Sequence, residues 1–189
     1  MSPRTVLVLG GVRAGKSAFA LARARAIGGR VVFVATAEAG DPEMAERIQR
    51  HQAERPPVWR TIEVPLEVPS TLVGLAGGAD LVIVDCLNLW VANLIQKRPE
   101  MSDTELLAEA AALESAIARS PFALILVSNE VGWGVHPETQ LGRRFRDALG
   151  LVNQAAARAA DEVVLMVAGC PVVVKHPDPS GTAAGGPTR

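Results

Sequence analysis

The sequence is poor in cysteine and has no long hydrophobic run. Its two cysteines, Cys86 and Cys170, lie far apart and belong to no CxxC pair, so neither a disulfide framework nor a zinc site is indicated. We expect both to be buried small apolar residues in a reducing compartment. No apolar stretch reaches the roughly 18 residues of a membrane helix, and the first residues lack the long apolar region of a signal peptide. These absences predict a cytoplasmic protein with no membrane insertion.

A surplus of charge of one sign is also missing. The chain has 19 basic and 20 acidic residues, a net charge of −1, which gives no basic surface for nucleic acid or anionic lipid. Lysine is scarce, occurring only at Lys16, Lys97 and Lys175. A lysine inside a glycine-rich loop is therefore informative.

The length and composition are those of an ordinary globular chain. Of the 189 residues, 49% are hydrophobic and 21% charged, which suits one domain with a real core. We assign this domain to residues 1–176. Residues 177–189 lack the apolar content of a packed segment, so they predict a disordered tail.

Strand and helix patterns alternate from end to end. Apolar runs predict strands over residues 6–9, 31–35, 59–64, 81–85, 122–127, 163–167 and 170–175. Between them, helices are expected over residues 18–26, 41–53, 70–76, 87–96, 102–119 and 137–158, the last with a potential break at Gly150. Such alternation predicts an α/β fold with a mostly parallel sheet covered by helices on both faces.

The first predicted strand runs into a glycine-rich loop. Gly10, Gly15, Lys16 and Ser17 fit the phosphate-binding pattern G-x-x-x-x-G-K-[ST], with a strand before it and a helix after it, as the motif requires. The glycines let backbone N–H groups turn toward phosphate oxygens, and the following helix presents its positive end to the same anion. Lys16 would reach the β- and γ-phosphates and the Ser17 hydroxyl would bind Mg²⁺. The loop predicts a site for a nucleoside triphosphate.

Other chemistry-bearing residues are expected at the same edge of the sheet. Ligands of parallel sheets bind at the carboxyl ends of the strands, so the loop should meet residues 36–38, Asp85 and the loop that begins at Asn129. Asp85 ends an apolar strand, where a carboxylate can hold Mg²⁺ or can simply cap the next helix.

His51 has two interpretations on the residues alone. It shares a helix face with Met44 and Ile48, which favours a structural histidine facing the core. Alternatively, Arg47 lies one turn away and disfavours the imidazolium form, and a neutral imidazole can act as a nucleophile on phosphorus.

Arg143, Arg144 and Arg146 cluster on one predicted helix. They could bind phosphates bidentately or form a solvated charged face.

Three motifs together resemble the bifunctional adenosylcobinamide kinase/adenosylcobinamide-phosphate guanylyltransferases of cobalamin biosynthesis. The first is GGVRAGKS at residues 10–17, where the family typically has GGxRSGKS. The second spans residues 35–63 and contains ATAE, DPEMAERIQRHQAER and the WRTIE that ends at Glu63. The third spans residues 129–163 and contains NEVGWG, FRD, NQ and ADEV. The resemblance covers nearly the whole chain up to Lys175.

The resemblance implies a P-loop α/β fold of the RecA type, a homotrimeric assembly and two reactions. In the first, ATP or GTP phosphorylates the aminopropanol hydroxyl of adenosylcobinamide, with Mg²⁺ and the phosphate loop stabilising the transferred charge. In the second, the histidine that aligns with His51 attacks the α-phosphate of GTP. Adenosylcobinamide phosphate then accepts GMP from this histidine to give adenosylcobinamide-GDP.

The resemblance also implies a set of site residues. His51 and Lys16 would be catalytic, and Ser17 and Asp85 would bind the metal. The nucleotide contacts would fall on Gly10, Gly11, Val12, Arg13, Ala14, Gly15, Lys16, Ser17, Thr36, Ala37, Glu38, Gln52, Ala53, Glu54, Arg55, Glu63 and Asp85.

Two other functions fit the phosphate loop alone. A single-function small-molecule kinase would need the loop but not His51. A GTP-dependent switch or ATPase module would also use the loop, although the chain has no Asn-Lys-x-Asp motif for guanine specificity.

Overall fold

A computed structural model describes residues 5–40 and 42–177, without the side chains of Glu43, Met44 and Arg47. Asp41, the first residue of the helix predicted over residues 41–53, the roles suggested for Met44 and Arg47, and the expected tail beyond Pro177 lie outside this description. The helices are α1 (Lys16–Ile27), α2 (Pro42–Ala53), α3 (Val68–Gly74), α4 (Leu87–Lys97), α5 (Asp103–Ala118) and α6 (Gln140–Ala159). The strands are β1 (Thr5–Gly10), β2 (Val31–Ala35), β3 (Arg60–Glu63), β4 (Leu81–Asp85), β5 (Ala123–Val127), β6 (Glu162–Val167) and β7 (Cys170–Lys175).

The strands form one sheet in the order β3-β2-β4-β5-β1-β6-β7. Strands β1 to β6 pair in parallel, and β7 pairs antiparallel with β6 to close one edge. The middle strands are continuous apolar runs because both of their faces are buried, as in parallel sheets generally. In β4, for example, Leu81 through Val84 are all fully buried.

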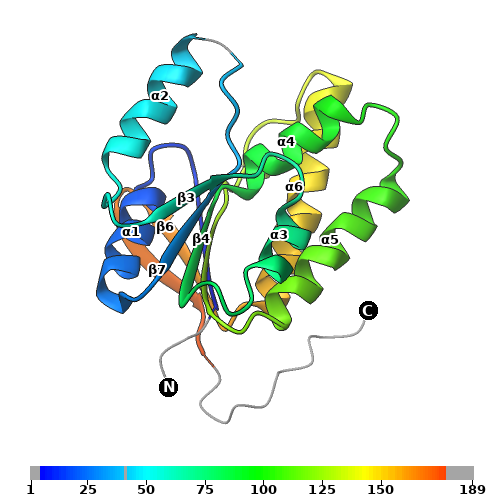
Figure 1. Ribbon diagram of the computed structural model, residues 1–189. Coiled ribbons are helices and arrows are strands. Elements are labelled where there is room, and N and C mark those ends of the chain that lie inside the picture. Colours follow the sequence, from blue (N-terminus) through cyan, green and yellow to red (C-terminus); the bar gives the residue numbers. More distant parts are fainter. Residues whose placement is uncertain (1–4, 41, 178–189) are drawn as a thin grey trace.

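Helices cover both faces of this sheet (Figure 1). Leu72 of α3, Trp90 of α4, Leu113 of α5 and Leu149 of α6 belong to one core cluster. Leu21 of α1 belongs to a second cluster, on the other face. The predicted mostly parallel, doubly covered sheet is therefore confirmed. Helix α2 stands beyond the edge of the sheet (Figure 1).

The α6 helix departs from its predicted bounds. It begins at Gln140 rather than Pro137, because the Thr139 hydroxyl accepts a hydrogen bond from the Gly142 N–H at 3.0 Å and caps the helix there. No break occurs at Gly150, since Leu149 and Val152 on either side of it are buried in the core and packing overrides the weak helix propensity of glycine.

Two smaller predictions also differ from the structure. Helix α3 begins at Val68, two residues earlier than predicted, because Pro69 fits the first turn of a helix. Cys86 is buried as predicted, but Cys170 is exposed, because it opens the edge strand β7. Among the described residues, no helix combines the length and apolar character needed to cross a membrane.

Candidate active site

The glycine-rich loop joins β1 to α1 in a conformation that its glycines make accessible. Gly10 and Gly15 have φ angles of 147° and 96°, a region that L-residues avoid. A Cβ atom at Gly10 would also lie 2.6 Å from the Met166 carbonyl oxygen. Lys16 is buried, and its Nζ donates to the Gly11 carbonyl at 2.7 Å. The lysine thus lies folded into the loop that would hold phosphate.

A cavity of about 690 Å³ opens beside this loop, at the carboxyl ends of the parallel strands. It is bounded on one side by residues 12–18 and on another by α2, through Ile48, His51 and Gln52. Its remaining lining comes from Arg55, after α2, and from residues at or just beyond the ends of β2, β3, β4 and β5. This is where ligands of doubly wound sheets bind.

Most of the predicted site residues meet in this cavity. The lining includes Val12, Arg13, Ala14, Gly15, Lys16, Ser17, Ala37, Glu38, His51, Gln52, Arg55, Glu63 and Asp85, together with Asn129 from the loop after β5. The lining does not include Gly10, Gly11, Thr36, Ala53 or Glu54.

Thr36 lies beneath the cavity rather than on its surface. Its side chain is fully buried, and its hydroxyl both accepts from the Cys86 N–H at 2.8 Å and donates to the Cys86 carbonyl at 2.7 Å. Both functions of the hydroxyl are thereby used within the protein. Thr36 fastens the end of β2 to the residue that follows Asp85.

Asp85 is an ionisable group of the cavity whose pKa is shifted by its surroundings. Burial raises the pKa of its carboxyl, because water is excluded from the charged form. The charge of His51, a hydrogen bond with Ser17 and the charges of Arg55 and Lys16 act against this rise. The carboxylate and the Ser17 hydroxyl therefore lie side by side, within reach of both the loop lysine and α2.

Arg55 is held at the cavity by stacking. Its guanidinium carbon lies 3.7 Å from the centroid of the Phe33 ring, a cation–π arrangement. Burial lowers its pKa, and Asp85, Glu54 and Glu63 act in the opposite direction. The Arg55 Nε atom is buried and has no hydrogen-bond partner among the described residues.

Asn88 is a lining residue that the sequence reasoning missed. It lies in the first turn of α4, three residues after Asp85, and its buried Oδ1 also lacks a partner among the described residues. Buried polar groups usually have partners, so Asn88 and Arg55, both in the cavity lining, retain unused hydrogen-bonding capacity that a polar ligand could meet. The position of Asn88, just after a strand-terminal acid, is the signal that could have identified it.

His51 lies on the face of α2 that borders the cavity. It is half-buried, and Ile48, one turn earlier, also contributes to the lining. Ile48 and His51 therefore face an open cavity rather than a closed core. Glu38, across the cavity on the segment after β2, is tied to Lys97 of α4 by an ion pair of 2.5 Å.

The three arginines of α6 do not line the cavity. Arg143 donates to the Pro137 and Glu138 carbonyls at 2.9 and 2.7 Å, and Arg144 donates to the Pro99 and Met101 carbonyls. Arg146 contacts Asp147 and the Nδ1 atom of His136. They hold loops in place, so neither the phosphate-binding nor the purely solvated interpretation describes them.

Solved structures of other proteins share this fold. A RadB recombinase superposes with a TM-score of 0.51 at 15% identity, covering 85% of this chain and 73% of that one. An ATPase of a bacterial type III secretion system superposes with a TM-score of 0.55 at 9% identity, covering 86% of this chain and 50% of that one. The chain therefore has the RecA-like P-loop α/β fold.

Comparisons of the sequence are more specific. Residues 6–174 match the family model for cobinamide kinase / cobinamide phosphate guanyltransferase. The bifunctional adenosylcobalamin biosynthesis protein CobP of Pseudomonas aeruginosa is 43% identical over 170 residues, which cover 89% of this chain and 96% of that protein. The bifunctional adenosylcobalamin biosynthesis protein CobU of Salmonella typhimurium is 39% identical over 182 residues, covering 90% and 99%. By these matches over nearly its whole length, the chain belongs to the cobinamide kinase / cobinamide phosphate guanyltransferase family.

Proposed function

We propose that this protein phosphorylates adenosylcobinamide and then transfers GMP from GTP to the product, giving adenosylcobinamide-GDP. Membership of the family supports both reactions. The observation that carries the proposal is that His51, Lys16, Ser17 and Asp85 line one cavity. The phosphate loop and the imidazole proposed as nucleophile thus border the same space, which supports both reactions on one triphosphate.

The kinase reaction would use the loop side of the cavity. Lys16 and the inward-turned N–H groups of the loop would bind the β- and γ-phosphates and stabilise charge on the transferred group. The aminopropanol hydroxyl of adenosylcobinamide attacks the γ-phosphorus of ATP or GTP, the bond to the β–γ bridging oxygen breaks, and the nucleoside diphosphate leaves.

The donor set also fits Mg²⁺. Asp85 and Ser17 place a carboxylate and a hydroxyl oxygen together, and Mg²⁺ in such sites is held by one or two protein oxygens plus phosphates and water. No group of three or more potential ligands among His, Cys, Asp and Glu occurs within the described part of the chain, and this mode of binding needs none. When bound, the ion would neutralise charge on the phosphates.

The guanylyl transfer would use the α2 side of the cavity. An imidazole nitrogen of His51 attacks the α-phosphorus of GTP, the bond to the α–β bridging oxygen breaks, and pyrophosphate leaves. A phosphate oxygen of adenosylcobinamide phosphate then attacks the same phosphorus, and the P–N bond breaks to return the imidazole. This route divides one difficult transfer into two steps. Arg55, Glu38, Gln52 and Glu63, which surround the remaining space, would contact the nucleotide.

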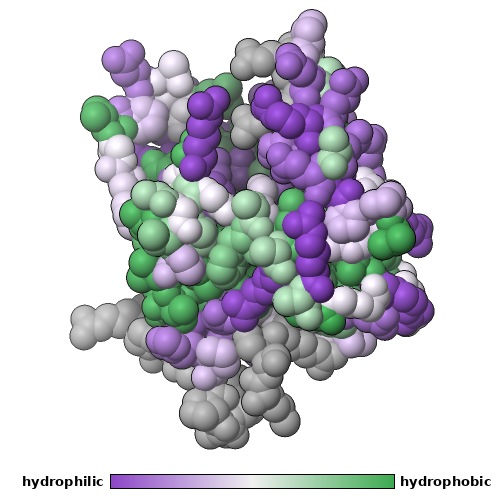
Figure 2. Space-filling model, turned by 90° about the vertical axis from the view of Figure 1, so that its left-hand side faces the viewer, coloured by the Kyte–Doolittle hydropathy of each residue, from purple (hydrophilic) through white to green (hydrophobic). Residues whose placement is uncertain are grey.

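We further propose a homotrimer that acts in the cytoplasm. The support for an assembly is the outer strand β7, where Val172, Val173 and Val174 are exposed at the edge of the sheet. Figure 2 shows the side that lies on the left of Figure 1, where β7 is found, and hydrophobic residues gather on the left half of that view. An apolar sheet edge of this kind favours contact with another chain. Sedimentation equilibrium would measure the stoichiometry, and a monomer across the micromolar range would contradict this proposal.

The deciding experiment is to label the protein with GTP that carries ³²P at the α-phosphate. The label should be acid-labile and base-stable, and it should map to His51. In the His51→Asn variant we expect the label and the guanylyl transfer to disappear while cobinamide phosphorylation continues. The matched control is His136→Asn, because His136 is exposed and outside the cavity.

The outcome also separates the alternative functions. Kinase turnover without any label on the wild-type protein would indicate a single-function kinase. Slow GTP hydrolysis without any cobinamide-dependent turnover would favour a nucleotide-dependent switch.

A further inference from the structure

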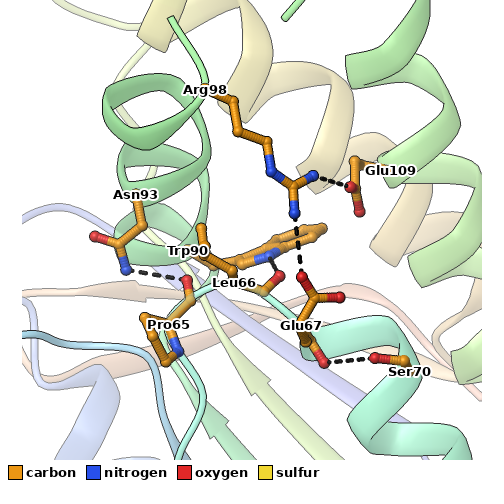
Figure 3. Close-up of polar contacts among 8 residues, drawn as sticks. All are labelled: Pro65, Leu66, Glu67, Ser70, Trp90, Asn93, Arg98 and Glu109. Atoms are coloured by element: carbon orange, nitrogen blue, oxygen red, sulfur yellow. Dashed lines mark hydrogen bonds and ion pairs between the residues drawn. The ribbon is translucent and has the colours of Figure 1, made fainter.

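Asn93 lies in α4 directly behind the cavity. Its side chain is buried, and its Nδ2 donates to two backbone carbonyls, that of Thr36 at 2.8 Å and that of Pro65 at 3.1 Å. Figure 3 shows Asn93 reaching from α4 to Pro65. Thr36 follows β2 and Pro65 follows β3, so one amide joins the ends of two strands.

Both carbonyls belong to segments that line the cavity. Ala37 and Glu38 come directly after Thr36, and Glu63 and Pro65 themselves lie in the lining. Beyond the end of a strand a carbonyl loses its partner in the sheet, and a buried carbonyl requires another donor. The Asn93 amide carries two N–H groups on one nitrogen, so this single side chain can donate to both carbonyls.

Thr36 also links this contact to the residue that follows Asp85. The carbonyl of Thr36 accepts from Asn93, and its hydroxyl is hydrogen-bonded to the backbone of Cys86. Trp90, one turn before Asn93, is fully buried and donates to the Leu66 carbonyl at 2.7 Å (Figure 3). The segments after β2, β3 and β4 are therefore fastened to one helix.

A second asparagine makes an equivalent contact at the β5 end. Asn153 of α6 is buried, its Nδ2 donates to the Asn129 carbonyl at 3.0 Å, and its Oδ1 accepts from the Ser128 hydroxyl at 2.7 Å. Asn129 lines the cavity. Both α4 and α6 pack in the same core cluster on one face of the sheet.

We propose that Asn93 and Asn153 are positioning residues for the nucleotide site, each holding strand-end loops from a helix behind it. The inference rests on the nucleotide site of the proposed function. Neither side chain lies in the cavity lining, so both act through the residues they hold. Removing the hydrogen bonds that orient metal ligands typically costs about 10- to 100-fold in metal affinity or activity, and we expect an effect of that order here.

The test compares Asn93→Leu and Asn153→Leu with the matched control Ser120→Ala. Ser120 is also buried and hydrogen-bonded to a backbone carbonyl, that of Ala116 at 2.8 Å, but it lies before β5, near the opposite end of the strands. We expect KM for GTP in guanylyl transfer to rise about 10- to 100-fold in both asparagine variants, with kcat changed far less. The control should lose thermal stability and keep its KM.

Asn93→Asp keeps the shape of the side chain, but its ionised carboxylate cannot donate to the two carbonyls, whereas Asn93→Leu removes the same hydrogen bonds without adding a charge. We expect it to raise KM as Asn93→Leu does, and to speed amide hydrogen exchange over residues 36–38 and 63–66. An unchanged KM and unchanged exchange, with only the melting temperature lowered as in Ser120→Ala, would overturn the proposal. A wild-type KM in one Leu variant alone would overturn it for that asparagine.

Binding of the fluorescent analogue mant-GTP keeps the test independent of catalysis. If the wild-type protein binds mant-GTP but transfers no GMP, the proposed function fails while the dissociation constants of the variants still judge the positioning role. Equal affinities in wild type and both Leu variants would refute that role whatever the reaction proves to be.

Discussion

At Asp85, burial and three basic side chains have opposite effects on the pKa of the carboxyl. Burial raises its pKa, whereas the nearby charges of His51, Arg55 and Lys16 lower it. Only the ionised carboxylate serves the proposed metal-binding role. The acid side of the pH–activity profile of the kinase reaction should therefore report on this balance.

We predict that kcat/KM for cobinamide phosphorylation falls, as pH decreases, at a higher pH than an exposed aspartate would impose. The sign follows from the raised pKa, because protonation of Asp85 then begins earlier during acidification. Arg55→Met removes a charge that favours the carboxylate, so its acid limb should move to still higher pH. Arg55→Lys keeps the charge and should leave the limb in place. An identical limb in the Met variant and the wild type would contradict this assignment.

The residues of the site differ in how far the sequence could identify them. Gly15, Lys16 and Ser17 belong to one local motif, and the structure gives them the predicted place beside the cavity. A local motif could not predict that Thr36 lies beneath the cavity, because its hydroxyl is hydrogen-bonded to Cys86, 50 positions away. Asn88 belongs to no motif, and only the cavity shows its unpaired oxygen.

At the scale of the element, the caps decide where helices begin. Ser102 and Glu105 form a capping box at α5: the Ser102 Oγ accepts from the Glu105 N–H at 3.3 Å, and the Glu105 carboxylate accepts from the Ser102 N–H at 2.7 Å. These contacts also lower the pKa of Glu105. A box of this kind is recognisable from the spacing of serine and glutamate in the sequence, because both partners lie within one turn.

We predict that Ser102→Ala lowers the free energy of unfolding by about 1 kcal/mol, the usual cost of losing an N-cap. Ser102→Asp should retain most of the stability, since aspartate also accepts from the helix N–H groups. Urea unfolding followed by circular dichroism measures both, and KM for GTP should remain unchanged because Ser102 is not part of the cavity lining. An equal loss of unfolding free energy in the Ala and Asp variants would show that the hydrogen-bond acceptor at the cap contributes nothing to stability.

The first residue of α6 was not predicted correctly because two nearby residues are each suited to the start of a helix. Pro137 and Thr139 are both good residues at helix starts. The Thr139 hydroxyl settles the choice by capping Gly142, and Arg143 occupies the carbonyls of Pro137 and Glu138. The sequence did not show that Arg143 would bind these carbonyls, because only the folded loop brings them within its reach. Arg143 could therefore be interpreted as a phosphate ligand.

At the scale of the whole molecule, strand order decides which residues meet. The phosphate loop follows β1, Asp85 ends β4, and β5 lies between these two strands. The alternating pattern predicted a parallel sheet, and hence one edge carrying all the strand ends. It could not predict the order of the strands, which depends on pairings between segments about 40 to 155 residues apart. The cavity exists because this order brings α2 opposite the loop.

A nucleotide bound between the loop and α2 contacts parts of the chain that little else connects, so it should stabilise the whole fold. At a GTP concentration of 100 times its Kd, binding adds about 2.7 kcal/mol to the free energy of unfolding. For a chain of this size we predict a rise in the melting temperature of about 5–10 °C.

Lys16→Ala provides the control, because it removes the buried cation of the loop and should abolish most of that rise at the same GTP concentration. The protein concentration must be held constant, since association of chains also shifts the melting temperature. A full shift in Lys16→Ala would place the triphosphate away from the loop. A full shift in His51→Asn, by contrast, is the expected result, because the imidazole is proposed to react with the nucleotide rather than to supply its affinity.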